Sequence, residues 1–162
     1  MKFAVAAFLS ILLIAATSPT VSAESFNGRF GFAVDVSHER YDEIDISTNG
    51  SGMDFVFKED PRVVASFYGN WHVLDSFASY AMHSIEEGAR ILDVAYEPDF
   101  FLIIYELDGV THKDIVRMYR ERIIYNAYFK APSEKFADFL PEFEQIEAGW
   151  KIGIPTSLNG LE

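Results

Sequence analysis

The chain has 162 residues, with 25 acidic and 13 basic side chains and a formal net charge of −12. A charge of this sign and size repels nucleic acid and anionic lipid headgroups, so neither is expected as a partner. The sequence contains no cysteine, which excludes disulfide bonds and thiol catalysis.

The first 23 residues follow the pattern of a secretory signal peptide. Lys2 supplies a positive charge, residues 3–16 are almost wholly apolar, and Val21-Ser22-Ala23 offers small side chains for cleavage. The apolar stretch is shorter than the roughly 20 residues that a membrane-spanning helix needs. We therefore predict cleavage after Ala23, a periplasmic or secreted location, and no stable membrane insertion after cleavage. Residues 24–152 are predicted to form one domain, and residues 153–162 a flexible tail.

Alternating apolar residues predict a series of strands after the signal peptide. Strands are expected at 29–36, 44–46, 53–58 and 63–68, and the Asn-Gly-rich segment 49–52 has the chemistry of a hairpin turn. The period then changes, and residues 74–85 have the apolar spacing of an amphipathic helix that stops near Gly88. Strands follow at 91–96, 100–107, 113–119 and 123–129.

A second helix is predicted after the last strand. Ser133 is the expected cap, and the apolar stripe includes Phe143 and Ile146, which should be buried against the strands. Pro141 predicts a break near Leu140 because its ring clashes with the preceding helical turn. Runs of strands alternating with helices predict an α+β fold, in which helices pack on an antiparallel β-sheet.

Several short motifs in this order resemble a known family. They are Phe30-Gly31-Phe32, Tyr68-Gly69, and Pro141-Glu142-Phe143 with Ile146, Trp150 and Lys151. The order is similar to that of small exported bacterial proteins with the fold of PsbP, the extrinsic P protein of photosystem II.

The resemblance covers nearly all of the chain after the signal peptide. It implies a PsbP-like sandwich of helices about an antiparallel sheet, and a role in binding or assembly, since the characterised members of the family act mostly in that way. The matching positions lie in turns and in the core, so no functional residue is carried over from the family.

Known catalytic and metal-binding patterns are not found in the sequence. The four histidines, His38, His72, His83 and His112, lack the spacing of zinc ligands, and no metal or other cofactor is predicted. Ser51 lies between two predicted strands, whereas a nucleophile elbow needs a strand and a helix. The acidic loop at 42–45 either offers oxygen ligands to a cation or is simply a solvated loop, and the sequence leaves both readings open. No catalytic residue is assigned.

Two groups of residues are candidates for contact with a ligand or partner. Tyr68, Trp71 and His72 lie where a strand is followed by a predicted helix, so an aromatic ring there either stacks on a ligand or caps the core. Arg117, Arg120 and Arg122 form the one basic cluster of the sequence. They either bind an anion or an acidic partner, or pair across strands with acidic residues of the chain itself.

The sequence therefore favours a non-enzymatic binding or assembly module of the cell envelope, whose partner is an envelope or secreted protein. One alternative is an inhibitor or immunity protein that neutralises a basic toxin or hydrolase, which the acidic charge would suit. A second alternative is an enzyme with an unrecognised site.

Overall fold

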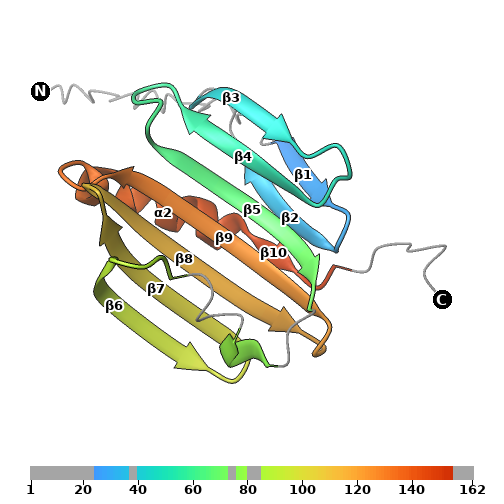
Figure 1. The fold of residues 1–162 in the computed structure, drawn as a ribbon. Helices are drawn as coiled ribbons and strands as arrows, with labels where there is room; N and C mark the ends of the chain where they lie inside the picture. Colours follow the sequence, from blue (N-terminus) through green and yellow to red (C-terminus); the bar gives the residue numbers. More distant parts are fainter. Residues whose placement is uncertain (1–23, 37–39, 73–75, 80–84, 155–162) are drawn as a thin grey trace, which may run out of the picture.

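A computed structural model describes residues 24–36, 40–72, 76–79 and 85–154 of the protein (Figure 1). The described residues form ten strands and the long helix α2 (Phe136–Gly149). The strands are β1 (Glu24–Gly28), β2 (Phe32–Val36), β3 (Tyr41–Ile46), β4 (Gly52–Phe57), β5 (Val64–Trp71), β6 (Arg90–Glu97), β7 (Phe100–Leu107), β8 (Val110–Tyr119), β9 (Ile123–Pro132) and β10 (Lys151–Ile152).

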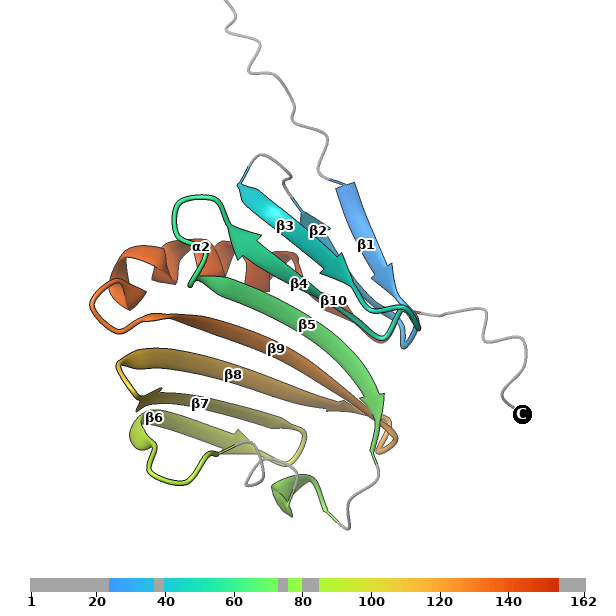
Figure 2. The same ribbon diagram turned by 45° about the horizontal axis from the view of Figure 1, so that its top comes forward.

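Seven strands form one antiparallel sheet in the order β3-β4-β5-β9-β8-β7-β6. Short turns join most neighbouring strands, as expected for an antiparallel sheet. In the turn between β3 and β4, Gly50 has a φ of 69°, a conformation that glycine adopts without steric cost. A second sheet has the order β1-β2-β10. It lies beside β3 and β4, as Figure 2 shows.

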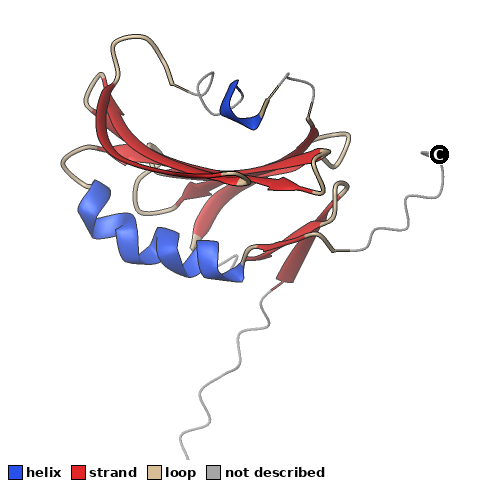
Figure 3. Ribbon diagram, turned by 90° about the horizontal axis from the view of Figure 1, so that it is seen from below, coloured by secondary structure: helices blue, strands red, loops and turns tan. Residues whose placement is uncertain are grey.

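The large sheet is curved and is covered differently on its two faces. Figure 3 shows α2 and the three-stranded sheet on one side, with a short helical segment at 77–79 on the other. The main core lies on the α2 side, where Phe57, Phe129 and Phe143 are almost fully buried. A smaller core lies on the opposite side, where Phe77 packs with residues such as Ile103. The fold is therefore α+β, with α2 packed on an antiparallel sheet, as the sequence predicts.

The N-terminal strand prediction needs correction. Residues 29–31 belong to a turn, in which Gly31 has a φ of 81° and its N–H donates to the carbonyl of Gly28 at 3.0 Å. The predicted strand therefore begins at Phe32, and the preceding residues form β1, which the sequence did not reveal. β1 is a short strand that pairs with β2, the next strand of the chain, and its own sequence does not show the apolar alternation that would predict it.

The expected break in the closing helix is wrong, because α2 runs continuously through Pro141. Pro141 lies near the start of the helix on its exposed side, so it removes one early hydrogen bond without facing the core. The buried side chains before and after it, Phe139 and Phe143, both pack on Phe57. This shared contact holds both parts of the helix against the same strand.

The expected cap at Ser133 is also wrong. The residue before the helix is Lys135, and no side chain caps the first turn. The hydroxyl of Ser133 instead accepts a hydrogen bond from Thr111 at 2.9 Å, so it is engaged in the sheet. Lys135 is held by Asp60, whose carboxylate lies 2.8 Å from Nζ.

The chain continues in an ordered way after α2. Lys151 and Ile152 pair with β2, and the N–H of Ile154 donates to the carbonyl of Gly31 at 2.8 Å. The signal peptide, most of the predicted helix 74–85 and residues 155–162 of the predicted tail lie outside the described residues. Among the described residues, no helix has the length and apolar character to cross a membrane.

Candidate functional site

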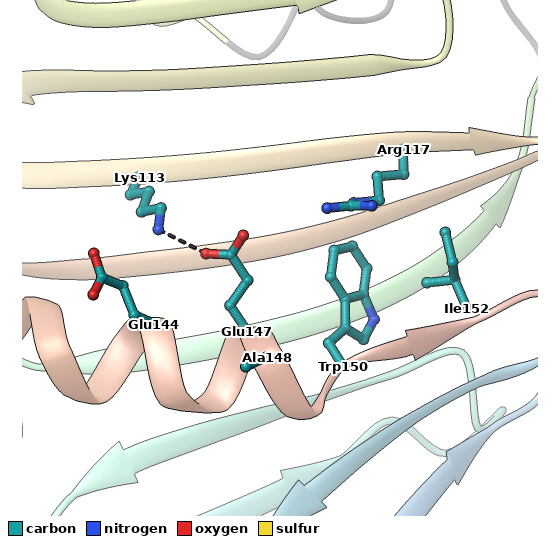
Figure 4. A pocket seen from close by; sticks show the side chains of 7 residues that line it. All are labelled: Lys113, Arg117, Glu144, Glu147, Ala148, Trp150 and Ile152. Atoms are coloured by element: carbon teal, nitrogen blue, oxygen red, sulfur yellow. Dashed lines mark hydrogen bonds and ion pairs between the residues drawn. The ribbon is translucent and has the colours of Figure 1, made fainter.

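A groove lies between β8 and the end of α2 on the α2 side of the sheet (Figure 4). Alternation along β8 turns Lys113 and Arg117 toward the helix. A spacing of three residues places Glu144 and Glu147 on the facing side of α2, and Trp150 follows directly after the helix. The cavity has a volume of about 590 Å³ and is lined by Lys113, Arg117, Glu144, Glu147, Ala148, Trp150 and Ile152.

One end of the groove is closed by an ion pair. Lys113 is only 6% exposed, and its ammonium donates to Glu147 Oε2 at 2.7 Å. The same Nζ lies 5.7 Å from the centre of the Phe129 ring, so the cation is held between a carboxylate and an aromatic face. The ammonium therefore has a carboxylate partner within the chain, and this part of the groove is internally satisfied.

Arg117, in contrast, is held by aromatic rings. Its guanidinium carbon lies 5.3 Å from the centre of the Phe100 ring and 5.9 Å from that of Trp150. No ion pair joins Arg117 to a carboxylate of the described residues. The two rings restrict the position of the cation and leave its charge without an anionic partner in that part of the chain.

Two buried N–H groups in this groove lack an acceptor among the described residues. They are Nε of Arg117 and Nε1 of Trp150. A buried donor without an acceptor costs about 1–3 kcal/mol, so such groups call for an explanation. Both side chains line the groove, so a hydrogen-bond acceptor of a bound partner would be stabilising there.

The groove continues past Arg117 toward the turn between β6 and β7. This second hollow has a volume of about 320 Å³ and is lined by Glu97, Asp99, Phe100, Arg117, Met118 and Ile152. Arg117 and Ile152 line both hollows, so they form one elongated site. Its rim is acidic, with Glu144 at one end and Glu97 and Asp99 at the other. The site therefore combines one aromatic-flanked cation with a negatively charged rim.

The sequence-predicted contact residues do not form a single site. Tyr68 and Arg117 project from opposite faces of the sheet, because the register places Tyr68 beside Asn126 and Arg117 beside Tyr125. The hydroxyl of Tyr68 donates to Asp54 Oδ2 at 2.6 Å. Burial, with this hydrogen bond, raises the pKa of Tyr68 well above its usual range, so the phenol stays protonated.

The other predicted residues lie at one end of the sheet. Trp71 is 42% exposed and has an edge-to-face contact with Phe30, with ring centres 5.6 Å apart. The N–H of His72 donates to the carbonyl of Arg122 at 2.8 Å. Arg120 occupies the turn after β8, at a φ of 52°, and its guanidinium stacks on Tyr119. The basic cluster is thus divided, with Arg117 in the groove and the other two arginines at or beside this turn.

Sequence reasoning missed Lys113, Glu147 and Trp150 as parts of the same site as Arg117. A signal was present, since residues 113 and 117 share one face of a strand and residue 150 follows residue 147 by the three-residue spacing of a helix side. What the sequence does not show is which strands the helix packs against.

Comparison with known proteins gives a fold and no family. No known protein family matches the chain, and no curated protein matches it. Among solved structures, the chain is similar to cyanobacterial PsbP (CyanoP) from Synechocystis, with a TM-score of 0.59 and 8% sequence identity. The match covers 86% of this chain and 98% of that protein. The fold is therefore PsbP-like, and at this level of identity the likeness shows the fold alone.

Proposed function

We propose that this protein is an exported, non-enzymatic binding module that docks a segment of an envelope or secreted protein in the groove between α2 and β8. Arg117 is the observation that carries the proposal. It is a cation fixed between two aromatic rings, with no ion pair to a carboxylate in the described chain. A carboxylate or a peptide carbonyl of the partner would receive hydrogen bonds there.

The charges on the rim specify the partner further. Glu97, Asp99 and Glu144 border the groove, so a partner with basic side chains on both sides of its acceptor would complement it. The net charge of the chain, −12, favours the approach of such a basic segment at a distance. An export signal at 1–23, supported by its charged, apolar and small-residue order, would bring the protein to the same compartment as such partners.

The PsbP-like fold is compatible with this role, and the resemblance of the sequence to small exported proteins of that fold points in the same direction. A basic toxin or hydrolase would also match the charge of the groove, in which case the binding module would act as an inhibitor. The two roles differ in the identity of the bound protein, which the following experiment determines.

The test is site-specific photo-crosslinking in the native host. A photoreactive amino acid placed at Glu144, on the rim, should give a crosslinked partner that mass spectrometry identifies. The same amino acid at Asp138, an exposed position in the first turn of α2, is the matched control and should give no such product.

The identified partner is then purified and titrated against the wild type, Arg117→Ala and Arg120→Ala. We expect at least a tenfold loss of affinity for Arg117→Ala and little change for Arg120→Ala, whose arginine lies in the turn outside the groove. Equal affinities for the wild type and a folded Arg117→Ala variant would show that the groove is not the docking site.

A further inference from the structure

A second cavity lies on the opposite face of the large sheet, away from the groove. Its volume is about 390 Å³, within the range of small-ligand pockets. It is lined by Ser66, Tyr68, Asp114, Ile115, Val116, Asn126, Ala127 and Tyr128. These residues come from β5, β9 and β8, three neighbouring strands, so the floor of the cavity is the sheet itself.

The unusual residue of this cavity is Asp114. It is only 9% exposed, and its Oδ1 has no hydrogen-bond partner among the described residues. Its neighbours across the strands are Ile103 and Tyr128, and neither carries a positive charge. Burial, with the nearby charge of Glu86, raises the pKa of Asp114 to about 7. Burying a carboxyl group without a hydrogen-bond partner lowers the stability of the fold, and a ligand that supplies a donor would remove that cost.

The walls beside Asp114 are aromatic and their hydroxyls are already engaged. Tyr68 donates to Asp54, and the hydroxyl of Tyr128 lies 2.5 Å from Nδ1 of His112. These hydrogen bonds fix the positions of the two tyrosine rings that line the cavity. Aromatic walls around an acidic group are the features that bind organic cations in proteins.

Acidic groups outnumber basic ones among the charges that act on the groups of this face. Burial raises the pKa of Tyr68, and the nearby Asp54 raises it further. Burial likewise raises the pKa of Asp114 and Tyr128, and Glu86 acts on both in the same direction. Lys130 is a cation on the same face, where burial and the charge of Lys130 lower the pKa of His112. The local field therefore favours a positively charged ligand.

We propose that this cavity binds an alkylammonium group, which donates a hydrogen bond to Asp114 and packs against Tyr68 and Tyr128. A metal ion fits the site less well. Among the described residues, no three His, Cys, Asp or Glu side chains lie close enough to hold a metal. A hard cation needs about six oxygen ligands, several of them carboxylates, whereas an ammonium needs one carboxylate and a few acceptors. Ser66 supplies a further polar group at the same cavity.

An alkylammonium group is carried both by small free amines and by the lysine side chains of proteins. The experiment uses 1,5-diaminopentane as the free amine, N-acetyl-lysine methylamide as the lysine analogue, and 1-pentanol as an uncharged control. Each is titrated into the ¹⁵N-labelled chain lacking residues 1–23, and binding is followed by backbone NMR shifts. Saturable shifts are expected at residues 66, 114, 126 and 128 with at least one amine, and none with pentanol.

Asp114→Asn tests the carboxylate, and Asp138→Asn on the exposed side of α2 is the matched control. We expect at least a tenfold weaker affinity for the amine in Asp114→Asn and no change in Asp138→Asn. Binding by both amines would indicate that the site also accepts protein lysines, and binding by diaminopentane alone would indicate a small free amine. The absence of saturable shifts in the wild type, equal binding of pentanol, or unchanged affinity in a folded Asp114→Asn variant would overturn the proposal.

Discussion

Arg117 on β8 lies over the indole ring of Trp150, which follows the end of α2, with 5.9 Å between the guanidinium carbon and the ring centre. This contact joins the sheet to the helix terminus at the centre of the groove. Trp150 also packs on Phe67, so the position of the ring is fixed from the core side. The contact therefore affects both the stability of the fold and the shape of the proposed docking site.

A double-mutant cycle will measure this contact. The variants are Arg117→Ala, Trp150→Leu and the double variant, compared by chemical denaturation. We expect a coupling energy of about 0.5–2 kcal/mol, the range for a partly desolvated cation–aromatic pair. A coupling indistinguishable from zero would mean that Arg117 is held by Phe100 alone. Arg120→Ala paired with Trp150→Leu is the control cycle and should be additive.

Phe143 is predicted to be the most important side chain of α2 for stability. It is fully buried and its ring contacts those of Phe57, Phe129, Phe136 and Phe139. Phe143→Ala should lower the free energy of unfolding by about 3–5 kcal/mol, since it removes a large side chain and leaves a cavity. Glu144→Ala, the next and exposed position, should change it by less than about 0.5 kcal/mol. A loss below about 1 kcal/mol for Phe143→Ala would contradict the docking of α2 on the sheet.

Asp114 should make stability depend on pH. Its pKa is about 7 in the folded protein, against an ordinary value of 3.8. Between these values the folded state holds more protons than the unfolded state, so stability falls as pH rises from 4 to 7. Asp114→Asn removes this loss and should raise the free energy of unfolding by about 1–4 kcal/mol at pH 8, with little effect at pH 4.

Denaturation curves at pH 4, 6 and 8 will measure this difference, with Asp138→Asn as a control that should show no such trend. A destabilised Asp114→Asn variant at pH 8 would show that the carboxylate has a stabilising partner in the folded protein.

Removing one partner of the Lys113–Glu147 ion pair should destabilise the protein more than replacing both partners by apolar residues. Glu147→Gln leaves a nearly buried ammonium without its carboxylate and should cost about 1–3 kcal/mol. The double variant Lys113→Met with Glu147→Leu should recover most of that loss, because it removes both charges together. Thermal denaturation of the single and double variants will compare them. A double variant less stable than Glu147→Gln would mean that the charges themselves, and not their pairing, are needed for packing.

Export of the protein is predicted to remove residues 1–23. N-terminal sequencing of the exported protein should begin with Glu24-Ser25-Phe26, the first residues of β1. Replacing Ala23 by a large residue should slow cleavage and leave the longer form detectable by mass spectrometry. An exported protein that retains residues 3–16 would contradict the prediction.

Much of the fold follows from the sequence, because the strands and the closing helix have strong local patterns. The alternation at 53–57 and 123–129 gives strands β4 and β9 almost as predicted, since one side of each strand is buried. The stripe that includes Phe143 and Ile146 likewise predicts the buried side of α2, and both residues are buried. These features depend on neighbours a few residues away, which a periodic pattern records.

Other features depend on partners distant in the chain, and only the tertiary structure decided them. Ser133 has the chemistry of a helix cap, but Thr111 on a neighbouring strand takes its hydroxyl. Pro141 would break an isolated helix, but the packing of α2 on Phe57 outweighs one lost hydrogen bond. In both cases a contact made by folding is stronger than the local preference.

The candidate sites were the least predictable part of the molecule. The sequence indicated Arg117 as a basic residue, but its neighbour Trp150 follows another element, and the packing of α2 on the sheet brings them together. Asp114 lies in a strand whose pattern gives no reason to expect a raised pKa. The pKa rises because the side chain is buried on the sheet face opposite α2, and the sequence does not show that burial. The sequence therefore determined the strands and the helix, through local periodicity. The tertiary structure decided which of their side chains share a cavity, because that depends on how distant elements cross and what they remove from water.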